Sequence, residues 1–138
     1  MSSGDLLRAE VKSGSEMSKQ LNELMQQGLL VPNEFILDMI KKAMLATVET
    51  SKGYLIDGYP RQVDQGIQFE SEIAPCHLVL YINASDASMT SRLLERGKSS
   101  GRVDDNEETI KNRLNTFHQV TQPVMDYYEK EGKLRTVN

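Results

Sequence analysis

Four arginines in the second half of the chain are well suited to chemistry, namely Arg92, Arg96, Arg102 and Arg113. Arg92 and Arg96 stand four residues apart on a predicted helix and therefore share one face of it. Guanidinium groups on one face repel each other unless an anion lies between them, so the pattern favours binding of a polyphosphate. The alternative is a set of surface arginines that pair with nearby carboxylates, namely Glu95, Asp104 and Glu107.

A second candidate site lies in the stretch Gly53–Arg61, GYLIDGYPR. The apolar run Tyr54–Ile56 is typical of a strand that is buried on both faces of a parallel sheet. Asp57, Gly58 and Arg61 follow it directly, and parallel sheets bind ligands just beyond the carboxyl ends of their strands. The stretch therefore predicts a ligand site with an acidic and a guanidinium side chain. The alternative is an ordinary strand-to-helix turn with solvated charges.

Further candidates lie close to these two groups. Arg8 follows Ser3 at the start of a predicted helix, where backbone N–H groups can hold an oxyanion. Gln65, one turn after Arg61, is suited to reading the edge of a base, although such a residue is also an ordinary surface glutamine. Residues 98–106, KSSGRVDDN, are small and polar, which is typical of a mobile flap that closes over a substrate. The alternative is an ordinary loop.

The composition limits the class of protein. With 138 residues, 38% hydrophobic and 26% charged, the chain suits one globular domain with a core of its own. A net charge of −4 argues against a nucleic-acid surface, which requires a basic face. Cys76 is the only cysteine and there are two histidines, so neither a disulfide nor a Cys/His zinc site is expected. No segment approaches the ~20 apolar residues of a membrane span, and a reducing cytosol is the natural setting.

The pattern of the chain predicts strands that alternate with helices. Helices are expected from the serines at 2 and 3 to Gly14, from Ser15 to Gly28, from Asn33 onward, over 63–73, from Ser85 to Gly97, and from an Asp105–Glu108 capping box to Gly132 with a bend at Pro123. Strands are expected at Tyr54–Ile56, at Leu78–Ile82 and at Leu134–Val137, the first two buried on both faces. This order is typical of an α/β fold with a parallel β-sheet flanked by helices.

Five of these stretches, in this order, resemble the successive motifs of the adenylate kinases, most closely the short-lid cytosolic form. They are Ser3–Arg8, Gly28–Pro32, Asp57–Arg61 with Gln65, Arg92–Gly97 and Gly101–Asn106. The resemblance spans essentially the whole chain, and the ordered set is far more specific than any single motif. It implies reversible phosphoryl transfer in which MgATP and AMP give two ADP.

The resemblance also implies a role for each candidate residue. AMP would be held by Ser3, Arg8, Gly58, Arg61 and Gln65, with the backbone around Leu30 and Val31. The ATP phosphates and the transferring group would be held by Arg92, Arg96, Arg102 and Arg113, which are thus the implied catalytic residues. Asp57 would belong, through water, to the environment of the Mg²⁺ ion that accompanies ATP. Asp104 and Asp105 would belong to the lid.

By the same resemblance, residues 1–138 would form a single adenylate kinase-like domain of the P-loop nucleoside monophosphate kinase type. Residues 2–31 would be the AMP-binding flap, residues 97–106 the short lid, and the remainder the core. The implied partners are ATP and AMP or ADP, with no nucleic acid and no membrane. The protein would be a cytoplasmic monomer.

One departure from the family pattern is large. The chain contains no G-x-x-x-x-G-K-[ST] phosphate loop, whose backbone amides and lysine would cradle the β- and γ-phosphates. We therefore expect an incomplete fold, either a fragment or an isoform that lacks both ends, with little or no transferase activity. Without the strand that precedes such a loop, the strands at 54–56 and 78–82 are expected to expose edges.

Two rival interpretations remain open from the sequence. The first is a UMP/CMP kinase, which shares this type of lid, although Gln65 and the tyrosine of Asp57–Arg61 favour adenylate. The second is a non-catalytic AMP-binding or interaction module that keeps the flap but has no ATP cradle. The choice of acceptor nucleotide and the affinity for ATP distinguish them.

Overall fold

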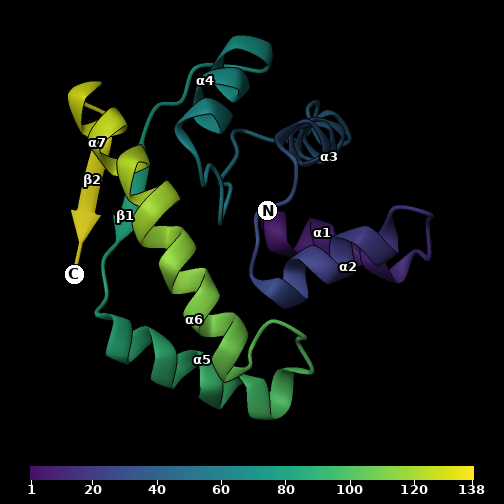
Figure 1. The fold of residues 1–138 in the computed structure, drawn as a ribbon. Coiled ribbons are helices and arrows are strands. Elements are labelled where there is room, and N and C mark those ends of the chain that lie inside the picture. Colours follow the sequence, from purple (N-terminus) through teal and green to yellow (C-terminus); the bar gives the residue numbers. More distant parts are fainter.

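The computed structural model describes residues 1–138 and combines helices with a small parallel sheet, which lies at one edge of the molecule beside α7 (Figure 1). The elements in chain order are α1 (Ser3–Lys12), α2 (Ser18–Gln27), α3 (Asn33–Leu45), α4 (Val63–Glu72), β1 (Val79–Ile82), α5 (Asp86–Ser100), α6 (Glu107–Thr116), the π-helix η1 (Phe117–Thr121), α7 (Gln122–Lys130) and β2 (Leu134–Val137). The α/β class that the sequence predicts is confirmed, with an incomplete sheet. No helix has both the length and the apolar character that crossing a membrane requires.

The first two helices form where the sequence predicts them. The Ser2 side chain accepts a hydrogen bond from the Asp5 amide and so caps α1. Gly28 ends α2 in the left-handed conformation, with φ of 69°, which costs a glycine no steric strain. Together with α3 these helices enclose the main apolar core, made of Leu7, Leu21, Val31, Ile36 and Ile40.

The sheet consists of β1 and β2, which run parallel from the pair Val79–Leu134 to the pair Ile82–Val137. The prediction of both strands is confirmed. Burial of the first strand on both faces is wrong, because Leu80 is 55% and Ile82 71% exposed. Alternating exposure along β1 is the pattern of a strand that is covered on one face only.

The predicted strand at Tyr54–Ile56 is not formed. This segment runs beside the N-terminus, where the chain makes a single parallel bridge between Ser2 and Asp57. The Asp57 amide donates to the Met1 carbonyl at 2.8 Å, and the terminal amine donates to the Leu55 carbonyl at 2.6 Å. Leu55 remains 76% exposed. A strand needs a continuous ladder of backbone hydrogen bonds to a neighbouring strand. The single bridge at Asp57 is too short to make this segment a strand.

Two helix boundaries differ from the prediction for reasons of packing. The helix after Ser85 does not end at Gly97 but continues to Ser100, where Gly101 adopts φ of 64°. A Cβ on Gly97 would lie 2.4 Å from the Asp105 carbonyl oxygen, so this glycine permits a close approach of backbone rather than a helix end. Asn106, not Asp105, caps the next helix and accepts from the Thr109 amide.

The start of α3 also differs. Pro32 occupies the cap position and Asn33 is the first helical residue. The Asn33 side-chain amide, expected to cap the helix, instead donates to the Gln68 side-chain oxygen on α4. A tertiary contact between two helices has therefore replaced a local one.

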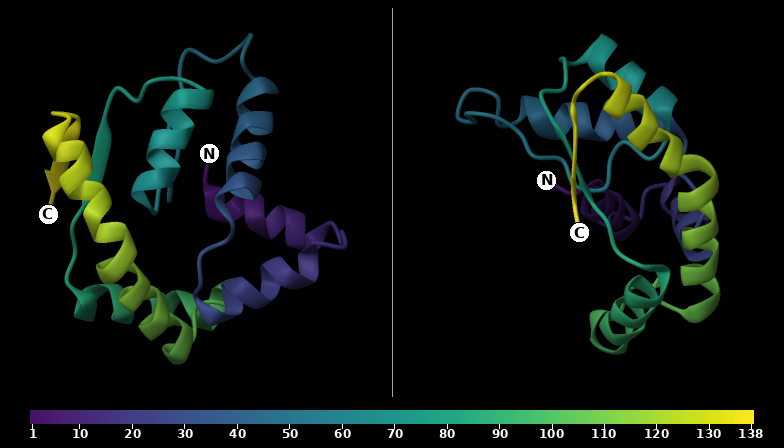
Figure 2. Two further views of the ribbon diagram at one scale, coloured as in Figure 1. Left: turned by 45° about the horizontal axis from the view of Figure 1, so that its top comes forward. Right: turned by 90° about the vertical axis from the view of Figure 1, so that its left-hand side faces the viewer.

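The long helix formed by α6, η1 and α7 runs along one side of the molecule from the loop after α5 to the sheet (Figure 2). It is interrupted just before Pro123, at Phe117–Thr121, where the Gln122 amide donates to the Phe117 carbonyl in the wider π pattern. Pro123 has no N–H to donate to the carbonyl four residues earlier, and its ring crowds that carbonyl. The bend predicted at Pro123 is therefore a widened turn.

Gly66 on α4 touches Tyr128 on α7, and the contact fixes how closely these helices pack. A Cβ on Gly66 would lie 2.3 Å from the Tyr128 hydroxyl oxygen. We therefore expect Gly66→Ala to lower the free energy of unfolding by about 1–3 kcal/mol, as overpacked sites do. Urea denaturation measures the change.

Two variants control this experiment. Tyr128→Phe removes the hydroxyl that an alanine would meet, so it should recover part of the loss when combined with Gly66→Ala. Gly53→Ala should be nearly neutral, because no heavy atom lies within 4 Å of its Cβ position. Equal losses in the single and the double variant would show that the helices do not pack in this way.

Candidate functional site

A buried carboxylate at the start of α6 organises the candidate site. The Asp105 side chain has no exposed surface, and Arg96 near the end of α5 binds both of its oxygens, at 2.7 Å from Nε and 2.6 Å from Nη2. Gly97 allows the Asp105 backbone to return close to α5. The bidentate pairing fixes the orientation of the guanidinium plane.

Arg113, two turns into α6, lies beside the same carboxylate group and beside that of Asp104. Its Nη1 lies 3.3 Å from Asp104 and 3.5 Å from Asp105. Nη1 of Arg113 and Oδ1 of Asp104 are nonetheless buried without a hydrogen-bond partner. Because buried polar atoms normally have partners, the two atoms leave unused hydrogen-bonding capacity in the site.

Arg96, Arg113, Asp104 and Asp105 form an arginine–carboxylate cluster. The Asp57–Arg61 turn brings a third guanidinium group, that of Arg61, close to this cluster. Arg61 donates from Nε to the Gly58 carbonyl at 2.9 Å, and its own amide donates to the Gln65 side-chain oxygen at 2.7 Å. Burial lowers the pKa of Arg61, and the positive charge of Arg113 lowers it further. Gln65 is fully buried, and its Nε2 has no partner.

Helix α1 contacts the same Asp57–Arg61 turn through Ser3. The Ser3 amide donates to the Asp57 carbonyl at 3.0 Å, and the Ser3 hydroxyl donates to the Gly58 carbonyl at 3.0 Å. Gly58 has φ of 76°, and a Cβ there would lie 3.1 Å from the Ser3 hydroxyl oxygen. Glycine is therefore required both by the backbone conformation and by the close approach of α1.

Arg8 and Arg102 complete the group of cations through a shared carboxylate. Arg8 pairs with Asp5 in the same helix, and Nη2 of Arg102 lies 4.0 Å from the same oxygen. The hydrogen bond from Arg8 lowers the pKa of Asp5, and the charge of Arg102 contributes in the same direction. Burial is the main cause of the lowered pKa of Arg61, and the positive charge of Arg8 contributes in the same direction.

Of the four arginines predicted to bind a polyphosphate, three are paired with carboxylates: Arg96 with Asp105, Arg102 with Asp5 and Arg113 with Asp104. Arg92 is exposed and its side chain makes no hydrogen bond or ion pair. Asp104 is a partner, as the surface-pair alternative expected, whereas Glu95 pairs with Lys98 instead. Leu30 is half-buried, and Val31 is buried in the main core.

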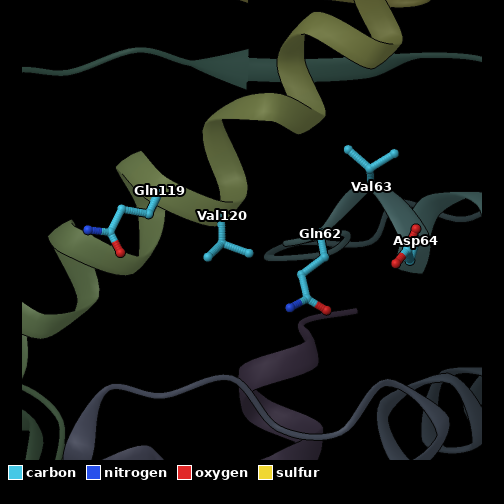
Figure 3. Close-up of a pocket in the computed structure, with 5 residues that line it drawn as sticks. All are labelled: Gln62, Val63, Asp64, Gln119 and Val120. Carbon is cyan, nitrogen blue, oxygen red and sulfur yellow. The ribbon is translucent and has the colours of Figure 1, made fainter.

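Two cavities lie beside the cluster rather than within it. The first, about 300 Å³, lies between the start of α4 and η1 and is lined by Gln62, Val63, Asp64, Gln119 and Val120 (Figure 3). The second, about 500 Å³, lies between α2, the loop before α6 and α6 itself. Neither cavity is lined by an arginine. In this structure the guanidinium groups are paired with carboxylates.

Several contacts that position the site were not predicted from the sequence. The Thr121 hydroxyl donates to the Arg61 carbonyl at 2.8 Å, and the Tyr59 hydroxyl donates to the Gln65 carbonyl at 3.0 Å. Burial raises the pKa of Tyr59 to about 12, so its hydroxyl remains a donor at neutral pH. A hydroxyl that bonds a carbonyl 60 residues away leaves no local pattern in the sequence.

No group of three or more histidine, cysteine or carboxylate side chains is placed to hold a metal ion. Asp57 is exposed at the turn. An exposed carboxylate of this kind fits contact through water with a magnesium ion that arrives on a nucleotide, since Mg²⁺ retains several of its waters.

An α/β protein with guanidinium groups gathered on shared carboxylates is of the class that binds phosphate-bearing ligands. Residues 1–133 match the model of one family in this class, described as adenylate kinase. The chain belongs to the adenylate kinase family. It is by family a nucleoside monophosphate kinase, of the class that transfers a phosphoryl group from ATP to AMP to give two ADP.

Curated relatives agree with this assignment over the whole chain. Adenylate kinase isoenzyme 1 of Bos taurus is 59% identical over 138 residues, which are 100% of this chain and 71% of that protein. The Homo sapiens isoenzyme 1 is 58% identical over the same share of each chain. The Caenorhabditis elegans isoenzyme 1 is 56% identical over 139 residues, which are 66% of its length. These relatives favour AMP over UMP or CMP as the acceptor.

The Arg96–Asp105 pair predicts how stability depends on pH. The hydrogen bonds from Arg96 hold the pKa of Asp105 below its ordinary value of 3.8, so the pair stabilises the fold above that pH. This contribution is lost as the pH falls through the lower, folded-state pKa. We expect Asp105→Asn to lower the free energy of unfolding by about 2 kcal/mol at pH 7, and the difference from wild type to shrink below pH 3.8. Urea denaturation across this range measures it.

Asp126→Asn provides the matched control, because Asp126 is exposed and unpaired on α7. Its stability should differ little from wild type at every pH. A loss for Asp105→Asn that stays constant down to low pH would contradict the ionic origin of the effect.

Proposed function

We propose that this chain binds AMP between α1 and the Asp57–Arg61 turn, and that Gln65 recognises the adenine base. The observation that carries the proposal is the buried Gln65 Nε2, which has no protein partner. The Gln65 Oε1 is fixed by the Arg61 amide at 2.7 Å, so the direction of the amide group is set. An unpaired buried donor in a fixed direction supports a ligand acceptor opposite it.

The AMP phosphate would lie between Arg8 and Arg61. Burial and the charge of Arg113 account for most of the lowered pKa of Arg61, and the positive charge of Arg8 adds to it, so the two guanidinium groups repel each other. A phosphate would remove this repulsion and accept charge-assisted hydrogen bonds from both groups. Ser3 and Gly58 would set the distance between α1 and the turn, and the backbone around Leu30 and Val31 would form the adjoining wall of the site.

On the other side of the cluster, Arg96, Arg102 and Arg113 would meet the ATP phosphates and the transferring group. In the present structure these arginines are paired with Asp5, Asp104 and Asp105. A polyphosphate would compete with the carboxylates for the same guanidinium groups. Residues 97–106 would act as the lid that closes over ATP, and residues 2–31 as the AMP flap. Arg92 would join the ATP phosphates from its exposed position on α5.

Magnesium enters with the substrate as MgATP, and Asp57 would meet its water shell. The Gly-rich phosphate loop is not among the 138 residues, and the remaining arginines do not replace its backbone amides. We therefore propose that these residues bind AMP but transfer the phosphoryl group weakly or not at all. We also propose a monomer in the cytoplasm, a setting consistent with a single free cysteine.

Calorimetry with AMP tests the proposal. Gln65→Glu keeps the oxygen that accepts from the Arg61 amide but replaces the free Nε2 donor with a second acceptor. We expect this change to weaken AMP binding by about tenfold or more, since losing a buried polar contact costs about 1–3 kcal/mol. CMP and UMP, which are smaller at the base, should bind the wild-type chain more weakly than AMP.

Asn115→Asp introduces the same charge at an exposed position on α6, outside the proposed flap and lid, and should leave AMP affinity unchanged. An AMP affinity that is equal in wild type and Gln65→Glu would reject Gln65 as the base-recognition residue. AMP-dependent ADP formation from MgATP at a normal kinase rate would reject the proposal that these residues transfer the phosphoryl group weakly.

A further inference from the structure

Three side chains of α6 donate hydrogen bonds to the carbonyls that end α2. Thr109 bonds the Gln26 carbonyl at 2.5 Å, Asn112 bonds the Gln27 carbonyl at 3.2 Å, and Thr116 bonds the Gly28 carbonyl at 3.5 Å. The donors stand three and four residues apart, so they form one row on the same face of α6. We call Thr109, Asn112 and Thr116 the α6 row.

The α6 row acts on groups that a helix cannot satisfy by itself. The last carbonyls of an α-helix have no partner within the helix and normally bond to water or to a capping group. Here their partners come from a helix more than 80 residues further along the chain. Thr109 is 3% exposed, and its bond to the carbonyl of the exposed Gln26 is partly buried.

Gly28 brings the same turn into contact with Arg113. A Cβ on Gly28 would lie 2.9 Å from the Thr109 carbonyl oxygen and 3.0 Å from Cγ of Arg113. The end of α2 is therefore in direct contact with α6, the helix that carries Arg113. Leu29, Leu30 and Val31 follow Gly28 directly. The backbone around Leu30 and Val31 is the segment proposed to line the AMP site.

We propose that Thr109 and Asn112 are positioning residues that hold the last turn of α2 in a fixed position relative to Arg113. Only the predicted change in AMP affinity rests on the proposed function; the positioning of the α2 turn does not. If the row breaks, the turn opens and the 29–31 segment spends less time in the position in which it is proposed to line the AMP site. The apparent affinity for AMP falls in proportion to the population of the closed turn.

Hydrogen exchange and calorimetry on the 138-residue chain test the inference. The Gly28 amide donates to the Met25 carbonyl and the Leu29 amide to the Leu24 carbonyl, so both report opening of this turn. Thr109→Val has the same shape but no hydroxyl, and losing one buried hydrogen bond is worth about fivefold. We expect about fivefold faster exchange at these two amides and about fivefold weaker AMP binding. The amides of α4 should exchange as in wild type.

Two variants separate positioning from general destabilisation. Thr109→Ser keeps the hydroxyl and should restore both the exchange rate and the AMP affinity. Thr90→Val, on α5, removes a hydroxyl that makes no hydrogen bond and should change neither.

Unchanged exchange at Gly28 and Leu29 in Thr109→Val would overturn the inference, whether or not AMP binds. Faster exchange throughout the chain would overturn it as well, because the role would then be structural only. Faster exchange confined to the turn, in a chain whose wild type does not bind AMP, would support the positioning role and reject the proposed function instead.

Discussion

The structure depends on one electrostatic constraint, which is that guanidinium groups gathered in one place must be separated by negative charge. Asp105 supplies that charge from a fully buried position, and Arg96 and Arg113 approach it from two different helices. Asp104 and Asp5 extend the arrangement toward Arg113, Arg8 and Arg102. Because carboxylates and phosphates present similar oxygen acceptors to arginine, the same geometry suits an exchange of carboxylate for phosphate when a nucleotide binds.

Local signals in the sequence were sufficient for most of the helices. Ser2 and Ser85 cap helices as predicted, and Gly28 ends one. The errors arose where distant contacts decided the outcome. Gly97 looked like a helix end, but its role is to admit the backbone of Asp105. The strand predicted at Tyr54–Ile56 has the expected apolar character but no ladder of partners, and a residue pattern cannot report whether a neighbouring strand is present.

The sequence predicted which residues form the candidate site, but not which carboxylate each arginine would contact. Arg92, Arg96, Arg102 and Arg113 were predicted to bind one polyphosphate, and the last three each contact a carboxylate, of Asp105, Asp5 and Asp104 respectively. Spacing also grouped Arg92 with them, although helical periodicity cannot tell which of two residues on a face meets a partner. Thr109 and Thr121 were missed, because threonine on a helix carries no sign of the distant carbonyl that its hydroxyl will bond.

The most direct test of the central claim follows the arginine Nε–H resonances by NMR while inorganic tripolyphosphate is added to the 138-residue chain. If the guanidinium groups share one anion-binding place, the signals of Arg96 and Arg113 should shift together and saturate with a single midpoint. Arg135, which bonds only to backbone carbonyls on β2 and beside it, serves as the internal reference and should shift little. Separate midpoints for Arg96 and Arg113, or shifts no larger than that of Arg135, would contradict the account.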